Sequence, residues 1–458
     1  MNELLRLSAT QQARLIRQRD VTSVELVTAH LERLEEVNPR INAAIEVFRD
    51  QALEAARVAD QLPASGPLHG VPFSIKDSIK IAGAQCTGGT FGRRDTPPSP
   101  CDATLVARLR EAGGIPLART NLPDLLFAFE SDNLLYGATR NPYDLSRTSG
   151  GSSGGEAALI ASGASPLGLG SDAAGSVRLP AAFCGIAGMK PTSGRLPRTG
   201  HYPPAGGWIE ALWQIGPMAR RVEDLCTVMP LLARGDGMDT TVVDMPFADP
   251  ASVDVSALRI AWYADNGFIA ANAEVAAVVR AAAGTLKAVE DRPPCLAKAY
   301  DLEMKLLGVD GGDDLSGYLV AIGSTEVHPL LTAWLDKLEA YRTDLAGFAR
   351  YWAEWDTYRA EIAYFFRRYD VIVCPAYTQP ALPLGTSTVE ENFKGFSHTM
   401  AFNVAGLPAA VVRCGTSATE LPIAVQIVAA PWREDLVLAV ALHLEEHFGG
   451  WSEPSLLG

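Results

Sequence analysis

Two serines set among glycines, together with one lysine, are the residues of this sequence best suited to covalent chemistry. Ser152 lies in the segment GGSSGGE (150–156), Ser176 lies in GSDAAGSVR (170–178), and Lys76 ends a short apolar stretch. A serine hydroxyl is a weak nucleophile that needs a base, and a lysine kept neutral by burial can be that base. Because Ser–Lys variants of the hydrolytic triad exist on unrelated folds, these residues predict acyl transfer without histidine.

The residues between and beside the serines support an active site. Helix-forming residues 156–161 would direct the positive end of a helix toward Ser152. The loop 173–176 can direct successive backbone N–H groups at one point, as an oxyanion hole requires. Stretches rich in glycine and serine are more often linkers, but a linker does not need the charged residues Asp172 and Arg178. We therefore interpret the segment as catalytic.

A competing motif lies near the end of the sequence. His443 and His447 match the inverted zinc-protease pattern, and two histidines four residues apart share a helix face. A zinc enzyme needs a third protein ligand, and the only carboxylate that follows is Glu453. The apolar face of the predicted helix passes through other positions, namely 437, 440, 441 and 444. A solvent-exposed helix face is therefore favoured over a metal site.

The composition indicates a soluble globular protein. The 458 residues are 48% hydrophobic, and 39 Lys and Arg against 53 Asp and Glu give a net charge of −14, which disfavours nucleic acid as a partner. No apolar run approaches the roughly 20 residues of a membrane span, and no secretory signal is visible. Seven scattered cysteines without a Cys-x-x-Cys pair indicate a reducing compartment. We expect the cytoplasm.

The hydrophobic patterns predict an α/β fold. Residues 22–25 carry a capping box that begins a helix. Strands and helices follow from period and composition, with strands expected at 70–75, 115–118, 370–375, 409–412 and 423–428, and helices at 102–109, 332–350, 351–368 and 435–447. We expect a single domain over 1–458, with N-terminal helices at 1–60, an α/β core at 61–234 and 366–458, and a helical cap or insertion at 235–365.

At the serines and the lysine, the sequence resembles the amidase signature family of serine hydrolases. The resemblance covers most of the chain and includes further matching segments, at 76–77, 102–104, 120–123, 141–142, 188–192, 216–218 and 402–409. It implies the amidase-signature fold, in which a mixed central β-sheet is covered by helices on both faces and carries a helical cap. It also implies that Ser176 is the acylated nucleophile, that Ser152 relays its proton from a cis peptide, and that Lys76 is the terminal base.

The resemblance implies further site residues. Backbone N–H groups hold the oxyanion, from Ala173, Ala174, Gly175 and Ser176, although most members have glycine in place of Ala174. A supporting network consists of Ser153, Ser171, Asp172 and Arg178. Leu126 lines the acyl pocket by alignment to the lipid-amide branch, and the other candidate substrate contacts are Gly151, Tyr202 and Trp208. Residues 201–213 are either a mobile lid or core aromatics. No metal and no organic cofactor is implied.

The motif is nearest to the fatty-acid-amide and broad-specificity amidase branches. The expected function is hydrolysis of the C–N acyl bond of a neutral, small-molecule amide. Aryl amides, esters and carbamates (urethanes) are also candidates, because the same attack serves each. The alternative is an amidotransferase A-type subunit that works in a complex, to which the charge of −14 is poorly suited. A zinc peptidase is the less favoured alternative. We expect a monomer or a homodimer.

Overall fold

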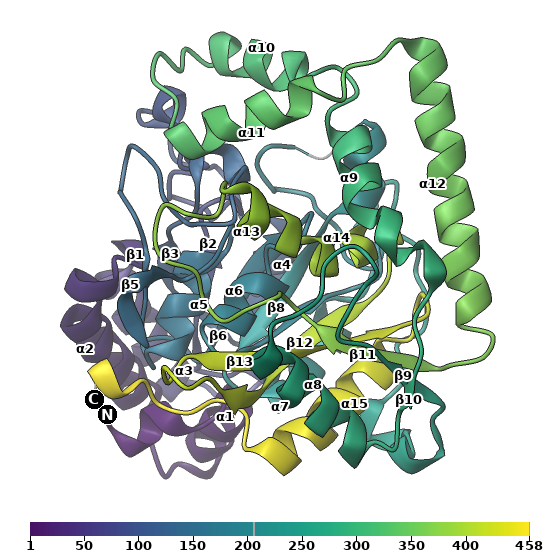
Figure 1. Ribbon diagram of the computed structural model, residues 1–458. Helices are drawn as coiled ribbons and strands as arrows, with labels where there is room; N and C mark the ends of the chain where they lie inside the picture. The colour runs from purple at the N-terminus through teal and green to yellow at the C-terminus, as the bar shows by residue number, and fades with distance from the viewer. Residues whose placement is uncertain (205–206, 458) are drawn as a thin grey trace.

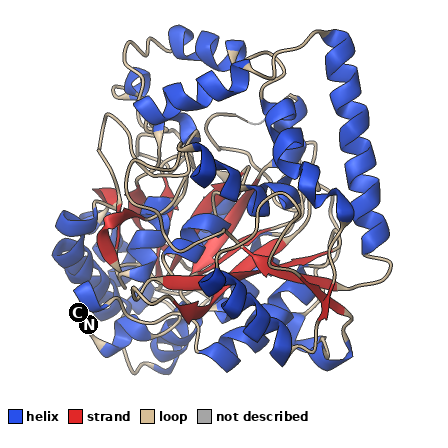
Figure 2. Ribbon diagram, viewed as in Figure 1, coloured by secondary structure: helices blue, strands red, loops and turns tan. Residues whose placement is uncertain are grey.

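The strands of the central sheet are short, apolar and rich in β-branched residues, as a sheet buried on both faces requires. The computed structural model describes residues 1–204 and 207–457, and it places eleven strands in one mixed sheet (Figures 1 and 2). In spatial order these are β1 (Ala44–Val47), β3 (Ile115–Thr120), β2 (Pro72–Lys76), β6 (Leu167–Asp172), β8 (Gln214–Ala219), β7 (Ala187–Lys190), β12 (Ala409–Thr416), β13 (Pro422–Ala429), β11 (Val371–Pro375), β9 (Ile260–Trp262) and β10 (Val289–Glu290).

The strand directions are mixed. Strands β3, β2 and β6 run parallel to one another, as do β11, β9 and β10, and the strands between the two groups pair antiparallel. A separate two-stranded sheet consists of β4 (Arg140–Asn141) and β5 (Asp144–Thr148). The parallel strands β2 and β6 are adjacent and end on the same side of the sheet, which brings Lys76 near residues 171–172.

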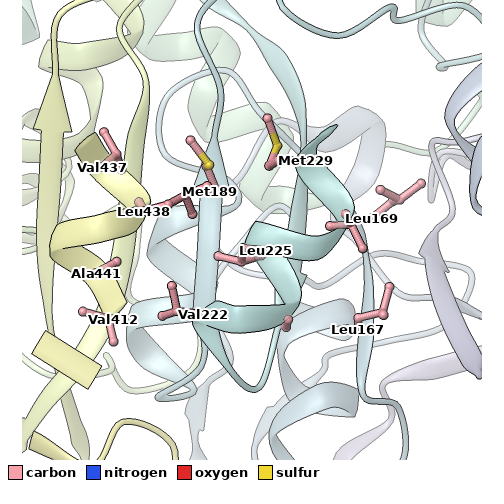
Figure 3. Close-up of a cluster of buried hydrophobic side chains, with 14 of the residues drawn as sticks. Leu167, Leu169, Met189, Val222, Leu225, Met229, Val412, Val437, Leu438 and Ala441 are labelled. Carbon is pink, nitrogen blue, oxygen red and sulfur yellow. The ribbon is translucent and has the colours of Figure 1, made fainter. Parts of the chain in front are cut away.

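One face of the sheet is covered by α4 (Thr104–Glu111), α7 (Val222–Leu232), α8 (Ala273–Thr285) and α15 (Glu434–Phe448). Their apolar side chains meet those of the strands in one buried cluster, of which Figure 3 labels Leu167, Leu169, Met189, Val222, Leu225, Met229, Val412, Val437, Leu438 and Ala441. Each fully buried leucine in such a cluster contributes about 1.5–3 kcal/mol through removal from water. This face is a continuous apolar core.

The opposite face is covered by α2 (Ser23–Ile41), α5 (Gly154–Ala161) and α6 (Arg178–Phe183). All eight residues of α5 are buried, which explains its small and apolar sequence. The fold is therefore α/β, with helices on both faces of a mixed sheet, as expected. The other helices are α1 (Ala9–Gln18), α3 (Arg49–Gln61), α9 (Ala299–Leu307), α10 (Asp313–Ala321), α11 (Pro329–Glu339), α12 (Leu345–Phe365), α13 (Glu390–Gly395) and α14 (Ser397–Val404).

Several predicted elements agree with the structure, and one boundary was wrong. Helix α2 begins with the expected capping box, in which the Glu25 N–H donates to Thr22 Oγ1 at 3.1 Å and the Thr22 N–H donates to Glu25 Oε2 at 2.8 Å. The break between the two late helices was expected at residue 350. It lies instead before Leu345, because Asp344 caps α12 by accepting the Gly347 N–H at 2.7 Å.

The segment 235–365, expected to be a helical insertion, also contributes to the sheet. Strand β9 pairs parallel to β11, β10 extends the same edge, and α8 packs on β11 and β13. Helices α10 and α11 lie above the sheet in the view of Figure 1, and α12 runs down the right side of the molecule. The three residues of β9 are too few for a strand pattern to be recognised. The N-terminal segment 1–60 likewise includes a strand, β1. The single-domain organisation stays a prediction.

The helices differ widely in length and polarity. Among those in the described ranges, none combines the length and the hydropathy needed to cross a bilayer.

Candidate active site

Lys76 is the last residue of β2, a strand whose five residues are all buried. Its Nζ lies 2.6 Å from Ser152 Oγ and 3.1 Å from Ser171 Oγ, and the side chain has no solvent exposure. Burial lowers the pKa of Lys76 well below its ordinary value of 10.5, against the opposing charges of Asp172 and Glu156. The apolar strand therefore presents a lysine whose neutral amine form is favoured directly to a serine hydroxyl.

Ser152 lies in the turn before α5. The peptide bond between Gly151 and Ser152 is cis. Gly151 passes so close to the preceding loop that a Cβ there would lie 2.6 Å from the backbone N of Glu130. The backbone N–H of Ser153 donates to the carbonyl oxygen of Ser176 at 3.1 Å, which joins the two serine loops. The described residues show no hydrogen bond between the Ser152 and Ser176 hydroxyls, which instead share one cavity.

Asp172 organises the loop that carries Ser176. Arg178 donates to both of its oxygens, from Nε at 2.9 Å and from Nη2 at 2.9 Å, and the Gly175 N–H donates to Oδ1 at 2.8 Å. Burial alone would raise the pKa of Asp172, but the Arg178 guanidinium holds it below its usual range. Asn403 on α14 also donates to Oδ1 at 2.9 Å. The loop is thus held by a carboxylate that stays ionised.

The backbone donors of this loop differ from the expectation at one position. The Gly175 N–H is already bonded to Asp172, so it is not available to an oxyanion. The N–H groups of Ala173, Ala174 and Ser176 have no hydrogen-bond partner in the part of the chain that the structure describes, and all three residues line the cavity. The φ of Gly175 is 128°, a backbone conformation that glycine adopts without strain. Three free donors remain.

The cavity over the serines is mainly apolar. Its volume is about 140 Å³, and its walls include an aromatic and aliphatic set from residues 125–129 together with Ile209, Trp213, Leu307 and Trp334. Beyond it lies an outer chamber of about 450 Å³, with Phe127, Ile209 and Leu307 lining both. The two chambers therefore adjoin and share part of their walls.

The predicted substrate contacts have mixed outcomes. Leu126 lines the cavity, whereas neither Gly151 nor Tyr202 is among the lining residues in the described ranges. The Tyr202 hydroxyl accepts a hydrogen bond from the Tyr318 hydroxyl on α10 at 2.6 Å, so the side chain connects the loop to α10. The side chain of Trp208 lies outside the described residues, and the choice between lid and core for 201–213 stays a prediction.

The predicted supporting residues lie together. The side chains of Ser171 and Lys76 are in hydrogen-bond contact, and Ser153 Oγ lies 3.3 Å from the Ser171 carbonyl oxygen, to which it donates. Asp172 and Arg178 form the buried ion pair described above. These contacts place all four predicted residues between the lysine and the Ser176 loop.

Sequence reasoning missed Glu156, which is fully buried on α5 beside the lysine. Burial raises the pKa of Glu156 to about 8, while the hydroxyls of Ser74 and Thr120 donate to its two oxygens. A signal was present, because the rest of the helix is apolar and its one carboxylate had to be buried with it. His201, expected only as part of a lid or of the core within 201–213, lines the cavity.

The histidines of the zinc-protease pattern lie elsewhere, on α15. That helix buries positions 437, 440, 441 and 444 against the sheet, as expected, while His443 is partly exposed and His447 is exposed. Within the described ranges, no group of three or more His, Cys, Asp or Glu side chains is arranged to hold a metal ion.

Comparison with known proteins gives consistent matches along the chain. The Amidase family model matches residues 25–438. Fatty-acid amide hydrolase 2-A of Danio rerio is 34% identical, over 99% of this chain and 91% of that protein. A glutamyl-tRNA(Gln) amidotransferase subunit from Moorella thermoacetica is 32% identical, over 97% of each. The structure of 6-aminohexanoate cyclic dimer hydrolase superposes with a TM-score of 0.89 and 29% identity, over 100% of both chains.

Proposed function

This chain belongs to the amidase signature family and is an amide hydrolase, and from that premise we propose that it cleaves neutral, largely apolar amides through an acyl-enzyme on Ser176. One observation carries the proposal. A fully buried lysine amine contacts Ser152 Oγ at 2.6 Å, and Ser152 lines the same apolar cavity as Ser176. A base, a relay and a nucleophile around one mainly apolar space support this proposal.

The proton route follows from these positions. Ser176 Oγ attacks the carbonyl carbon while its proton passes to Ser152 Oγ, and the proton of Ser152 passes to the neutral amine of Lys76. The C–N bond then breaks as the lysine ammonium returns a proton, through Ser152, to the leaving nitrogen. Water repeats the attack on the resulting ester and releases the carboxylic acid, which restores all three side chains. Burial that lowers the pKa of Lys76 keeps the amine ready for the first step.

The negative oxygen of the tetrahedral intermediate needs hydrogen-bond donors. The unpaired N–H groups of Ala173, Ala174 and Ser176 supply them in this proposal, and Asp172 fixes the loop that carries them. Removing one donor of such a hole typically costs about 2.7–4 kcal/mol of barrier. No metal or organic cofactor is required by this sequence of steps.

The cavity walls favour apolar substrates. Aliphatic and aromatic side chains surround the serines, and the charged side chain among the lining residues, Asp172, is already paired with Arg178. Neutral aliphatic or aryl amides, and the carbamates and esters that the same attack can open, match these walls. The outer chamber, of about 450 Å³, adds room for a substituent of the amide.

An amidotransferase subunit is the second candidate, because a subunit of that kind is 32% identical over nearly the full length. Its substrate group would arrive as the polar amide of glutamine, with an α-ammonium and an α-carboxylate. Among the described residues that line the inner cavity, no unpaired charged side chain is present to receive either charge, and Asp310 and Asp314 of the outer chamber offer nothing to the α-carboxylate. We therefore rank it below the free hydrolase. A monomer or homodimer in the cytoplasm stays our prediction.

The test is covalent labelling of the purified chain with a fluorophosphonate, followed by mass spectrometry of the modified peptide. The proposal predicts one adduct, on Ser176, with hydrolysis of simple anilides by the chain alone. Ser176→Ala should abolish both, and His443→Gln on α15 is the control that should change neither. Turnover that appears only after a partner protein and charged tRNA are added would instead support the amidotransferase.

A further inference from the structure

His201 lines the catalytic cavity, and the proposed steps do not use it. The residue follows Gly200, its backbone N–H donates to the Arg198 carbonyl at 2.9 Å, and it lines the cavity together with Ser152 and Ser176. Only 6% of the residue is exposed, and its ring packs on Trp213 with 4.5 Å between centroids. Its Nε2 is buried and has no hydrogen-bond partner in the described part of the chain.

The hydrogen bonding of the ring fixes what Nε2 can do. Nδ1 lies 3.1 Å from the carbonyl oxygen of Pro203, and because a carbonyl only accepts, Nδ1 carries the hydrogen and donates it. Burial lowers the pKa of His201 to about 3, and the charges of Lys76 and Arg198 act in the same direction. The imidazole is therefore neutral at ordinary pH, and Nε2 presents a lone pair. It is an acceptor without a donor.

Buried acceptors are normally satisfied, and leaving one unpaired costs free energy that a ligand can recover. In the proposed reaction, the amide oxygen goes to the backbone donors of 173–176 and the nitrogen receives its proton through Ser152. The hydrogen already on a secondary amide nitrogen still loses its bond to water inside the cavity. The Asp172 carboxylate is occupied by Arg178 and by backbone N–H groups, so it does not accept that hydrogen. Nε2 of His201 does.

We propose that His201 Nε2 accepts the N–H of the scissile amide or carbamate, which makes the site selective for acyl donors that carry an N–H. The inference rests on the proposed function and names its substrate class. In the tetrahedral intermediate, the nitrogen has one hydrogen and one lone pair, so holding the hydrogen also fixes the direction of the lone pair. The lone pair then faces the proton that Ser152 delivers. Esters and N-methylated amides have no such hydrogen and gain nothing from the histidine.

The experiment compares three acyl donors with the same acyl and aryl groups: a secondary anilide, its N-methyl anilide and the aryl ester. In His201→Phe, which keeps an aromatic ring against Trp213 but has no acceptor, we expect kcat/KM for the secondary anilide to fall roughly tenfold to a hundredfold. For the ester and the N-methyl anilide, we expect it to stay within roughly threefold of wild type, since neither uses the acceptor. His201→Gln restores an acceptor and should recover much of the anilide rate. His443→Gln is the matched control outside the cavity.

Two results would overturn the inference: an equal loss on all three substrates, or no advantage of the Gln variant over the Phe variant. His201→Leu fills the site without an acceptor and replaces the Phe variant in the comparison if the Phe variant does not fold. Fluorophosphonate labelling of Ser176 in each variant separates the two claims. If wild type neither labels at Ser176 nor hydrolyses any of the donors, the proposed function fails. If wild type labels and hydrolyses but the variants show no selective change, only the role of His201 fails.

Discussion

Lys76 has no solvent exposure, and in place of water its amine has the hydroxyls of Ser152 and Ser171 as neighbours. The charges of Asp172 and Glu156 favour its protonated form, and burial outweighs them. The same burial that makes the amine a base also lowers the free energy of unfolding, because the unfolded chain can protonate the amine more readily. Activity and stability are therefore expected to change in opposite directions when the lysine is replaced.

Lys76→Met tests this opposition. Catalysis should fall roughly 100- to 10,000-fold, the usual contribution of a general base, measured as kcat on an anilide. In the unfolded chain the amine has its ordinary pKa of 10.5, and in the folded chain the pKa is lower, so unfolding below pH 10.5 takes up a proton. The cost to folding of keeping the Lys76 amine neutral is absent above pH 10.5 and grows as the pH falls toward the lowered pKa of the folded chain. We therefore expect the variant to be at least as stable as wild type at pH 7 in denaturant unfolding, with an advantage that shrinks toward pH 10. A variant much less stable at pH 7 would contradict the argument.

Ser152→Ala tests the relay. The variant keeps the nucleophile and the base but breaks the chain of hydroxyls between them, so acylation of Ser176 should slow roughly 100- to 10,000-fold. The measurement is the rate of fluorophosphonate labelling together with anilide turnover. Ser153→Ala, one residue along the same turn, removes two 3.3 Å hydrogen bonds, one to the Ser171 carbonyl and one from the Ser171 N–H, and should lose far less. Equal losses in the two variants would mean that Ser152 is no relay.

At the scale of elements, one carboxylate joins three parts of the fold. Asp172 ends β6, its partner Arg178 begins α6, and its second donor Asn403 lies on α14. Neither Asp172 nor Arg178 has appreciable exposure, so the pair lies in a low-dielectric region. The turn that carries Ser176 is thereby fixed to the sheet and to two helices, although the turn itself is irregular.

Asp172→Ala is expected to destabilise the protein strongly, because it leaves the Arg178 guanidinium buried without its counter-charge. Breaking a buried pair in this way typically costs about 3–5 kcal/mol of unfolding free energy, measured by denaturant titration. Asp313→Ala is a matched control, since Arg342 also contacts both oxygens of Asp313, at 2.6 and 2.9 Å, but at the surface. It should cost no more than about 1 kcal/mol. A small effect at Asp172 would show that the turn is held by other contacts.

The sequence was informative about the site where several characteristic residues lie close together in one short segment. The glycine-rich turns and the apolar strand before Lys76 led to side chains that do lie together, because their spacing follows directly from β2, β6 and α5. The sequence was uninformative about short strands that pair with distant partners, and about which backbone N–H groups are already hydrogen-bonded. The three residues of β9 pair in the sheet with β11, which is distant in sequence. The N–H of Gly175 donates to Asp172 within a local turn that no residue pattern reveals.

On the scale of the whole molecule, the cavity is assembled from segments far apart in sequence. The serines come from the core, whereas Leu307 comes from α9 and Trp334 from α11. A hydrogen bond of 2.6 Å between the hydroxyls of Tyr318 and Tyr202 also connects a third helix, α10, to the core. His201 was assigned only to a lid or to the core for the same reason, since nothing near it in sequence shows that it lines one cavity with the serines. Specificity therefore depends on how the later helices sit over the sheet.

Leu307→Trp tests this view, because Leu307 lines both the inner cavity and the outer chamber. A larger side chain at this shared wall should narrow the passage between them. Short acetyl anilides, which occupy the inner cavity alone, should keep their kcat/KM, whereas amides with long substituents should lose roughly tenfold or more, the scale on which a pocket discriminates by size. Val320→Trp on the exposed side of α10 is the control, with 79% of Val320 in solvent. If short and long amides lose equally, the two chambers do not form one substrate path, and the size of the substituent is limited elsewhere.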